Sequence, residues 1–223
     1  MIFVRSQVLS SDRWGLAGWR LVLDWSLPYV PGQWVQLRLP GLDDPRMYSI
    51  ANPPGQRAIT ILYTLLAEGR LTPRLSLLKP GDIIEVAGPG GAFEAEKGSN
   101  LWIAGGTGIA PFLSMQKLIE SKWYGPNSRP TLLQSNKLED DLYGSEIFSD
   151  LNERNLLKYY PFVTQGTNSG PRITEWLDAQ DRSFFKAFER IMICGSTSMI
   201  LDLRDLLLGR GVDFHRIVSE VYF

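Results

Sequence analysis

The stretch AGGTGIAP (residues 104–111) follows an apolar run at 101–104 and precedes a segment of helical character at 111–120. Glycines let a backbone approach a pyrophosphate closely, and the start of a helix favours an anion. No Gly-Lys-Ser/Thr of a Walker loop follows, and Pro111 stands where the dinucleotide fingerprint has its third glycine. The stretch therefore predicts a strand, a turn and a helix, while a nucleotide site and a purely structural tight turn both remain open.

Strand-like and helical runs alternate from this stretch onward. The predicted strands lie at 101–104, 131–134, 160–164 and 191–194, and the predicted helices lie at 111–120, 144–154, from 173, and at 198–208. Such alternation is typical of a parallel sheet with crossover helices. We therefore expect an α/β domain over residues 98–223.

Upstream of residue 98 the pattern is different. Short runs rich in β-branched and aromatic residues are separated by turn-forming Pro and Gly clusters, and they lie at 2–9, 19–25, 34–39, 59–66 and 83–86. Regularly spaced short strands are typical of a β-barrel or a β-sandwich. We therefore expect a separate β domain over residues 1–97.

The composition is that of an ordinary globular protein. The 223 residues are 44% hydrophobic and 21% charged, which excludes an intrinsically disordered chain. Lys and Arg total 23 against 24 Asp and Glu, so the net charge of −1 gives no electrostatic basis for general nucleic-acid binding. The single cysteine, Cys194, and the single histidine, His215, cannot build an internal disulfide, a Cys/His zinc site or a four-cysteine iron–sulfur centre. We expect no metal site.

The first residues, MIFVRSQVL, lack the basic segment, apolar run and cleavage site of a signal peptide. The longest weakly polar run, at 101–115, is interrupted by glycines and is shorter than the ~20 residues that a membrane-spanning helix needs. We therefore expect a cytoplasmic protein without a membrane partner, and we expect a monomer.

A second motif, Arg46-Met47-Tyr48-Ser49, opens a strand-like segment in the first domain. An arginine can pair with phosphate, a tyrosine can lie on an aromatic ring, and a serine hydroxyl can bond a ring nitrogen. Taken alone, the four residues are more typical of an exposed charge, a half-buried tyrosine and a turn serine. Their context in the chain decides between these interpretations.

Six segments occur in an order and spacing that resemble the ferredoxin–NADP(+) reductase family. They are RMYSIAN (46–52), GRLTPRLSLLKPGD (69–82), GPGGAF (88–93), AGGTGIAP (104–111), CGS (194–196) and SEVYF (219–223). The resemblance runs over nearly the whole chain. It implies an N-terminal six-stranded antiparallel β-barrel that binds a flavin and a C-terminal α/β domain with a parallel sheet that binds NAD(P)H.

The resemblance assigns residues of the first domain to the flavin. Arg46 would contact its phosphates, Tyr48 its isoalloxazine, and Ser49 the region of its N5 atom. The turn at 70–72 would meet the pyrophosphate through backbone N–H groups and a hydroxyl, and residues 62–64 would run beside the flavin and its ribityl chain. Related FMN enzymes share the Arg-x-Tyr-Ser/Thr motif, whereas the Gly-x-Leu-Thr turn and the aromatic terminus favour FAD. The residues assigned to the flavin are Arg46, Met47, Tyr48, Ser49, Leu62, Tyr63, Thr64, Arg70, Leu71 and Thr72.

The resemblance assigns residues of the second domain to the nicotinamide dinucleotide. The glycine stretch would take the pyrophosphate, and the cysteine strand end would lie by the nicotinamide, although a lone cysteine is also typical of a small buried hydrophobic position. Tyr222 would stack on the flavin and move for hydride transfer. The residues are Gly105, Gly106, Thr107, Gly108, Cys194, Gly195, Tyr222 and Phe223. Ser49, Cys194, Glu220 and Tyr222 are the candidate catalytic residues, which would shape the site without covalent chemistry.

Coenzyme preference depends on basic residues that bind the 2'-phosphate of NADP. Lys137 and Arg172 stand where bacterial family members carry such residues, and we expect NADP(H). Gln165 departs from the pattern, because many bacterial members have an arginine there. Lys137 and Arg172 are equally compatible with solvated surface charges.

The implied reaction is hydride transfer between nicotinamide C4 and flavin N5, linked to one-electron exchange with a carrier. We expect a ferredoxin/flavodoxin–NADP(+) reductase that contains FAD and has ferredoxin or flavodoxin as its partner. The alternatives are an NAD(P)H–flavin reductase, the reductase component of an oxygenase, and a non-catalytic nucleotide-sensing subunit.

Overall fold

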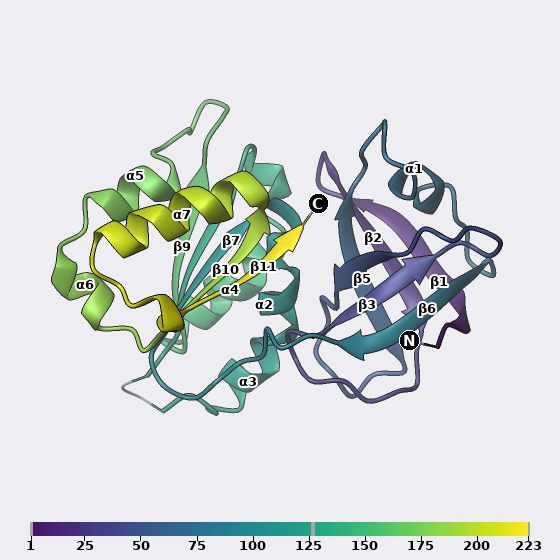
Figure 1. Cartoon of the computed structure of the whole chain (residues 1–223), viewed down its shortest axis with the longest axis horizontal. Helices are drawn as coiled ribbons and strands as arrows, with labels where there is room; N and C mark the ends of the chain where they lie inside the picture. Colours follow the sequence, from purple (N-terminus) through teal and green to yellow (C-terminus); the bar gives the residue numbers. More distant parts are fainter. Residues whose placement is uncertain (1, 126–127, 223) are drawn as a thin grey trace. The chain divides into compact units, whose positions relative to one another are not determined.

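The computed structural model describes residues 2–125 and 128–222, and it leaves the side chain of Tyr222 undescribed. The chain forms two compact units (Figure 1). The first unit comprises residues 1–94 and 110–115, and the second comprises residues 95–109 and 116–223. Each unit is described below by itself.

The first unit is a six-stranded antiparallel sheet with the order β4-β3-β6-β1-β2-β5. An isolated bridge between Ile50 and Ile61 ties the chain after β4 to β5, so the sheet closes into the barrel that the family resemblance implied. One short helix, α1 (Thr72–Leu75), follows β5. The strands are β1 (Val4–Trp14), β2 (Gly18–Asp24), β3 (Trp34–Arg38), β4 (Arg46–Ser49), β5 (Ala58–Thr64) and β6 (Ile83–Gly90).

The barrel core follows the two-residue period of a strand, in which alternate side chains point inward. Leu21 and Leu23 of β2 are fully buried, as are Val35 and Leu37 of β3. Burial of such aliphatic side chains is the main source of stability for the sheet. The β-branched and aromatic runs recognised in the sequence therefore become the inward faces of the barrel.

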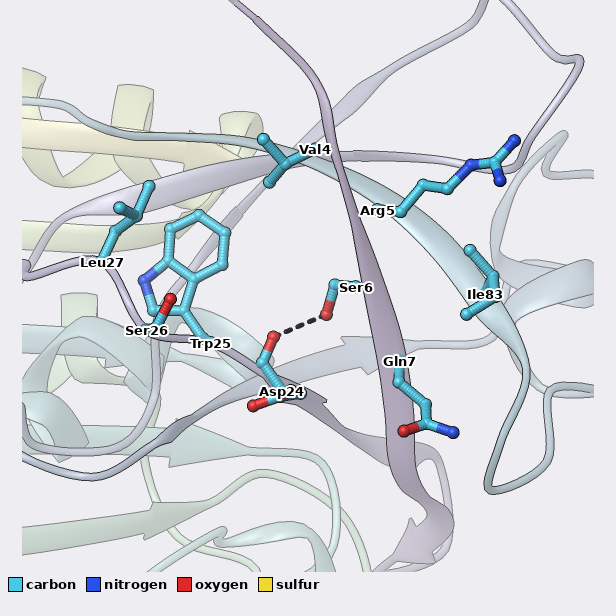
Figure 2. Close-up of a pocket in the computed structure, with 9 residues that line it drawn as sticks. All are labelled: Val4, Arg5, Ser6, Gln7, Asp24, Trp25, Ser26, Leu27 and Ile83. Atoms are coloured by element: carbon cyan, nitrogen blue, oxygen red, sulfur yellow. Dashed lines mark hydrogen bonds between the residues drawn. The ribbon is translucent and has the colours of Figure 1, made fainter.

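Strand β1 changes partner along its length. Its register with β2 is broken by an irregularity between Val8 and Ser10, and residues 4–7 pair with β6 instead. In the part of β1 that no longer pairs with β2, Ser6 Oγ donates a hydrogen bond of 2.7 Å to the carbonyl of Asp24, the last residue of β2 (Figure 2). An open pocket of about 420 Å³ lies there, lined by residues 4–7 and 24–27 and by Ile83. It contains none of the site residues predicted from the sequence.

The second unit is a five-stranded sheet with the order β11-β10-β7-β8-β9, and all of its neighbouring strands are parallel. The expected parallel α/β architecture is therefore confirmed. The strands are β7 (Asn100–Gly105), β8 (Thr131–Asn136), β9 (Lys158–Val163), β10 (Arg190–Ser196) and β11 (Ile217–Tyr222). The helical segments of this unit are η1 (Gly106–Ile109), α3 (Gln116–Glu120), η2 (Glu139–Asp141), α4 (Ser145–Glu153), α5 (Ile173–Asp178), α6 (Arg182–Lys186), α7 (Thr197–Gly209) and η3 (Phe214–Arg216).

The central strand β7 has a near-continuous buried run, which is typical of a parallel strand covered on both faces. Leu101 and Ile103 of β7 belong to a core cluster that also includes Ile200 and Leu203 of α7. Figure 1 shows α7 lying across the strands of this unit. Within residues 2–125 and 128–222, no helix has both the length and the apolar character needed to cross a membrane.

The helix predicted at 111–120 is two short helices, α2 (Ala110–Ser114) and α3, separated at Met115. Ser114 Oγ donates to the Pro111 carbonyl at 2.6 Å, and Met115 N donates to the Phe112 carbonyl at 3.1 Å. In a continuous α-helix Met115 N would bond Pro111, so the serine hydroxyl takes the place of a helical hydrogen bond. The prediction of one helix was wrong for this local reason.

Candidate functional site

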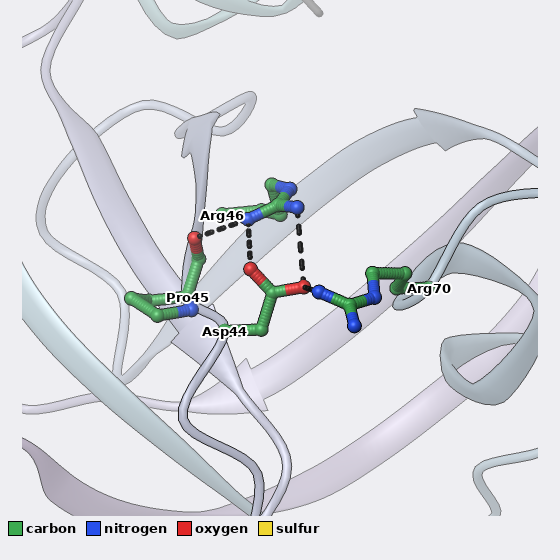
Figure 3. A network of polar contacts seen from close by, with 4 residues as sticks. All are labelled: Asp44, Pro45, Arg46 and Arg70. Atoms are coloured by element: carbon green, nitrogen blue, oxygen red, sulfur yellow. Dashed lines mark hydrogen bonds and ion pairs between the residues drawn. The ribbon is translucent and has the colours of Figure 1, made fainter.

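Arg46 and Arg70, both predicted to contact the flavin, meet at the carboxylate of Asp44 (Figure 3). Both terminal nitrogens of Arg46 donate to Asp44, Nη1 to Oδ1 and Nη2 to Oδ2, the latter at 3.1 Å. Arg46 Nη1 also donates to the Pro45 carbonyl at 3.1 Å, and Arg70 Nη1 donates to Asp44 Oδ2 at 3.5 Å. The first unit thus contains two guanidinium groups converging on one anionic group.

The rest of strand β4 turns from the surface into the barrel. Met47 is exposed, whereas Tyr48 and Ser49 are buried, with Tyr48 8% exposed. The Tyr48 ring lies edge-on to Tyr63, with 6.3 Å between ring centroids. Burial raises the pKa of Tyr48 to about 12, and the positive charge of Arg46 opposes this shift. The Tyr48 phenol therefore stays protonated well above neutral pH, and the barrel covers most of its side chain.

The β5 residues predicted to run beside the flavin face different environments. Leu62 and Tyr63 are buried, and Thr64 is exposed. Tyr63 packs beside Trp19 with nearly parallel rings, 6.5 Å between centroids and 20° between planes. Burial also raises the pKa of Tyr63. Tyr63 therefore belongs to the barrel core, whereas Thr64, the last residue of β5, is exposed.

The turn after β5 uses the predicted phosphate-binding hydroxyl for its own structure. Thr72 Oγ1 accepts a hydrogen bond of 3.0 Å from Leu66 N and lies 3.4 Å from the Leu66 carbonyl. Leu71 is buried in the barrel core, and Arg70 is left exposed. A contact between the Thr72 hydroxyl and pyrophosphate stays a prediction, and such a contact would compete with the bonds to Leu66.

Two glycines of the AGGTGIAP stretch lie close to other atoms of the second unit, Gly108 against backbone and Gly105 against the flexible end of a side chain. A Cβ added at Gly108 would lie 2.2 Å from the carbonyl oxygen of Cys194, so the turn touches the backbone of β10. A Cβ added at Gly105 would lie 2.4 Å from Met199 Sδ, and one added at Gly195 would lie 2.9 Å from Met199 Cε. The Met199 side chain therefore lies against the ends of two neighbouring strands.

Gly106 has a different environment from the other two glycines of the turn. Its φ of +57° is a conformation that favours glycine, and a Cβ there would meet nothing within 4 Å. Thr107, the next residue, is half-buried. Gly106 is therefore the glycine of this stretch whose backbone faces open space, where a phosphate could approach.

The strand ends bring Cys194 and Glu220 into register on neighbouring parallel strands. Cys194 is fully buried, as expected of a small hydrophobic side chain. Ser196 is the N-cap of α7 and accepts a hydrogen bond of 3.4 Å from Met199 N. The backbone of Tyr222 pairs with Ser196, while Phe223 lies outside the described residues. Stacking of Tyr222 on a flavin stays a prediction.

The predicted 2'-phosphate residues lie directly after β8, for Lys137, and at the N-cap of α5, for Arg172. Lys137 and Arg172 are both exposed. Gln165 N donates a hydrogen bond of 2.8 Å to the Lys137 carbonyl, so the uncharged Gln165 lies beside Lys137. The Arg172 backbone N donates to Glu175 Oε2 at 2.9 Å at the start of α5. The positively charged Lys137 and the neutral Gln165 are therefore neighbours after β8 and β9.

Sequence reasoning missed Asp44, Met199 and Ser114. The signal for Asp44 was available, because an acidic residue two positions from Arg46 can pair with it. The contacts of Met199 with two glycines, and of Ser114 Oγ with Gly32 N at 2.8 Å, join residues distant in sequence. No local pattern predicts such contacts.

Residues 16–95 match the sequence model of the oxidoreductase FAD-binding domain, and residues 102–205 match that of the oxidoreductase NAD-binding domain. Ferredoxin–NADP reductase A of Sorangium cellulosum (strain So ce56) is 29% identical over 214 residues, covering 84% of this chain and 76% of the relative. The chain therefore contains an FAD-binding and an NAD-binding oxidoreductase domain, and over most of its length it is similar to a ferredoxin–NADP reductase. The predicted cofactor-binding domains, one for FAD and one for NAD(P), are thereby confirmed.

Other proteins similar to this chain have different named roles. The reductase component DmpP of phenol 2-monooxygenase from Pseudomonas sp. (strain CF600) is 32% identical over 211 residues, covering 87% of this chain. The chain spans only 58% of the length of that relative. A crystal structure of a ferredoxin NADP+ reductase from Neisseria gonorrhoeae with bound FAD and NADP has a TM-score of 0.86 and 22% identity, with 99% of each chain covered. That likeness shows the shared fold.

Proposed function

We propose that this protein is a flavin-dependent reductase that transfers electrons between NADP(H) and a one-electron carrier, either ferredoxin or flavodoxin. The observation that carries the proposal is that one chain of 223 residues contains both an FAD-binding and an NAD-binding oxidoreductase domain. When bound, a flavin accepts two electrons from a nicotinamide as hydride and releases them one at a time. The pairing of these two domains is what such an activity requires.

The residues of the first unit fit an FAD pyrophosphate. Arg46 and Arg70 point toward one carboxylate, and guanidinium groups bind phosphate through the same donors. In this proposal they hold the pyrophosphate, while Tyr48 and Ser49 lie nearer the isoalloxazine. The Tyr48 phenol is neutral near pH 7, so its hydroxyl can donate or accept a hydrogen bond without adding charge.

The residues of the second unit fit a dinucleotide less uniformly. Gly106 offers the open backbone for a pyrophosphate, and Lys137 and Arg172 supply positive charge for a 2'-phosphate. We therefore propose NADP(H) as the coenzyme, with Gln165 as the position that weakens the preference over NADH. Cys194 and Glu220, in register on β10 and β11, would shape the nicotinamide side of the site.

A second candidate is the reductase component of an oxygenase. It is favoured by the 32% identity to the reductase component of phenol 2-monooxygenase. In that case the electron acceptor would be an iron–sulfur group of an oxygenase system instead of a separate ferredoxin or flavodoxin. An NAD(P)H–flavin reductase is a further alternative, in which the acceptor is free flavin.

The test is a visible spectrum of the purified protein followed by stopped-flow bleaching with NADPH and NADH. A flavin band that NADPH bleaches faster, with reoxidation by ferredoxin or flavodoxin faster than by free FMN, is the expected result. Faster bleaching by NADH would favour the oxygenase-linked candidate, and faster reoxidation by free FMN would favour a flavin reductase. A protein without a flavin band after incubation with FAD would contradict all three. We also propose that the protein is cytoplasmic and monomeric, which cell fractionation and size-exclusion chromatography would test.

A further inference from the structure

The ion-pair cluster of the first unit places a carboxylate between the two guanidinium groups that we assign to the FAD pyrophosphate. Asp44 accepts from both terminal nitrogens of Arg46, one through each carboxylate oxygen. Arg70 Nη1 reaches the same Oδ2 atom at 3.5 Å. Figure 3 shows the ends of both arginine side chains directed at this one carboxylate.

A guanidinium binds carboxylate and phosphate through the same planar fork of N–H donors. Because Asp44 occupies the end of the Arg46 fork, a phosphate using the same two nitrogens must replace the carboxylate. The cluster is open to solvent, since the side chains of Asp44 and Arg70 are 31% and 81% exposed. Exposed ion pairs contribute little to stability, so such a replacement is feasible.

We propose that Asp44 is an internal competitor of the flavin phosphates. The inference rests on the proposed flavin-binding function. In the protein without flavin, the Asp44 carboxylate pairs with Arg46 and Arg70. When FAD binds, its pyrophosphate replaces the carboxylate as the partner of both guanidinium groups. When FAD dissociates, the ion pairs with Asp44 form again. A carboxylate that stays beside a bound phosphate also repels it. Asp44 therefore lowers the affinity for phosphate-bearing flavins and makes the cofactor easier to exchange.

The experiment compares Asp44→Asn with Asp43→Asn in the full chain. Asparagine keeps the size of the side chain and one acceptor oxygen but removes the charge. Asp43 is a matched control because it is the adjacent acidic residue and pairs with Arg38, at 3.2 Å, instead of with the two flavin-assigned arginines. Flavin fluorescence follows equilibrium binding of FAD and of riboflavin, and the release of FAD from the loaded protein. Asp44→Ala provides a second variant without any acceptor.

The expected result is that Asp44→Asn binds FAD about fivefold more tightly and releases it about fivefold more slowly, as for loss of one exposed ion pair. Riboflavin, which has no phosphate, should bind both variants like the parent protein, and Asp43→Asn should leave FAD binding unchanged. Weaker FAD binding by Asp44→Asn would make Asp44 a positioning residue and overturn the proposal. Unchanged FAD binding, or equal shifts for FAD and riboflavin, would also overturn it. A parent protein that binds neither flavin would overturn the proposed function itself, so the two failures are distinguishable.

Discussion

The two motifs that we assign to phosphate groups are built from different parts of the chain. In the first unit, Arg46 and Arg70 offer exposed charged side chains, already paired to a carboxylate. In the second unit, the glycine turn offers backbone, and Gly108 lies against the backbone of Cys194, where an added Cβ has no room. The side-chain motif can be altered while the barrel stays intact, whereas the backbone motif is inseparable from the packing of its sheet.

Gly108→Ala should have the largest effect, because it disrupts the packing of the glycine turn against strand β10. The new Cβ would lie 2.2 Å from the Cys194 carbonyl oxygen, so the turn and β10 must move apart. We expect the free energy of unfolding to fall by about 3 kcal/mol, the cost of a severe overpacking. Thermal unfolding measures this change.

Gly106→Ala is the control for that prediction. It has open space for a Cβ but a positive φ, so the expected cost is about 1 kcal/mol. Equal destabilisation by the two variants would show that the contact with Cys194 does not determine the requirement for glycine at position 108.

Arg46→Ala should separate binding from stability in the side-chain motif. We expect FAD affinity to fall about thirtyfold, because a charged hydrogen bond to phosphate contributes about 2 kcal/mol. The unfolding temperature should change little, since an exposed ion pair contributes at most about 1 kcal/mol. Fluorescence titration and thermal unfolding give the two quantities. Arg57→Ala, which removes another exposed barrel arginine, paired to Asp24 at 3.3 Å, should leave FAD affinity unchanged.

Arg172→Ala extends the comparison to a side-chain contact within the second unit. We expect the KM for NADPH to rise about tenfold while the KM for NADH stays nearly constant, because only NADPH carries the 2'-phosphate. Steady-state kinetics with both coenzymes measure the effect. Gln165→Arg should act in the opposite direction. Equal effects of Arg172→Ala on the two coenzymes would remove Arg172 from the phosphate site.

Thr72→Val should have the smallest effect. It tests whether the Thr72 hydroxyl stabilises the turn or binds the pyrophosphate. Loss of the hydrogen bond with Leu66 N should lower the free energy of unfolding by about 1 kcal/mol, and Thr72→Ser should retain most of it. Chemical denaturation measures both variants. A large loss of FAD affinity with unchanged stability would assign the hydroxyl to the pyrophosphate instead.

The sequence predicted the architecture well because strand periodicity and helix alternation are local signals. Strands β2, β3 and β8 begin within a residue of their predicted starts. The helix at 111–120 was predicted wrongly because Ser114 Oγ replaces a backbone hydrogen bond, a choice that residue preferences do not encode. The paired arginines were found through the family resemblance, whereas the carboxylate between them was not.

The glycine stretch shows a second limit of sequence reasoning. Glycines in a strand-to-helix turn were interpreted as room for a ligand. Their assignment to a pyrophosphate stays a prediction, but an added Cβ at Gly105 or Gly108 would meet the protein's own atoms, and only Gly106 of the three has open space. A sequence reports that a side chain is absent but does not report what fills the place, because the neighbours come from distant strands.

The short helix α2 has a consequence for chimeric proteins. Phe112 is fully buried and lies edge-on to Phe93, and Ser114 accepts a hydrogen bond from Gly32, so residues 110–115 are packed as part of the barrel. A chimera that joined two family members near residue 98 would set α2 of one parent against the barrel of the other. A chimera designed to exchange coenzyme specificity should therefore take residues 110–115 from the same parent as the barrel. The rest of the sequence after residue 98 would come from the other parent.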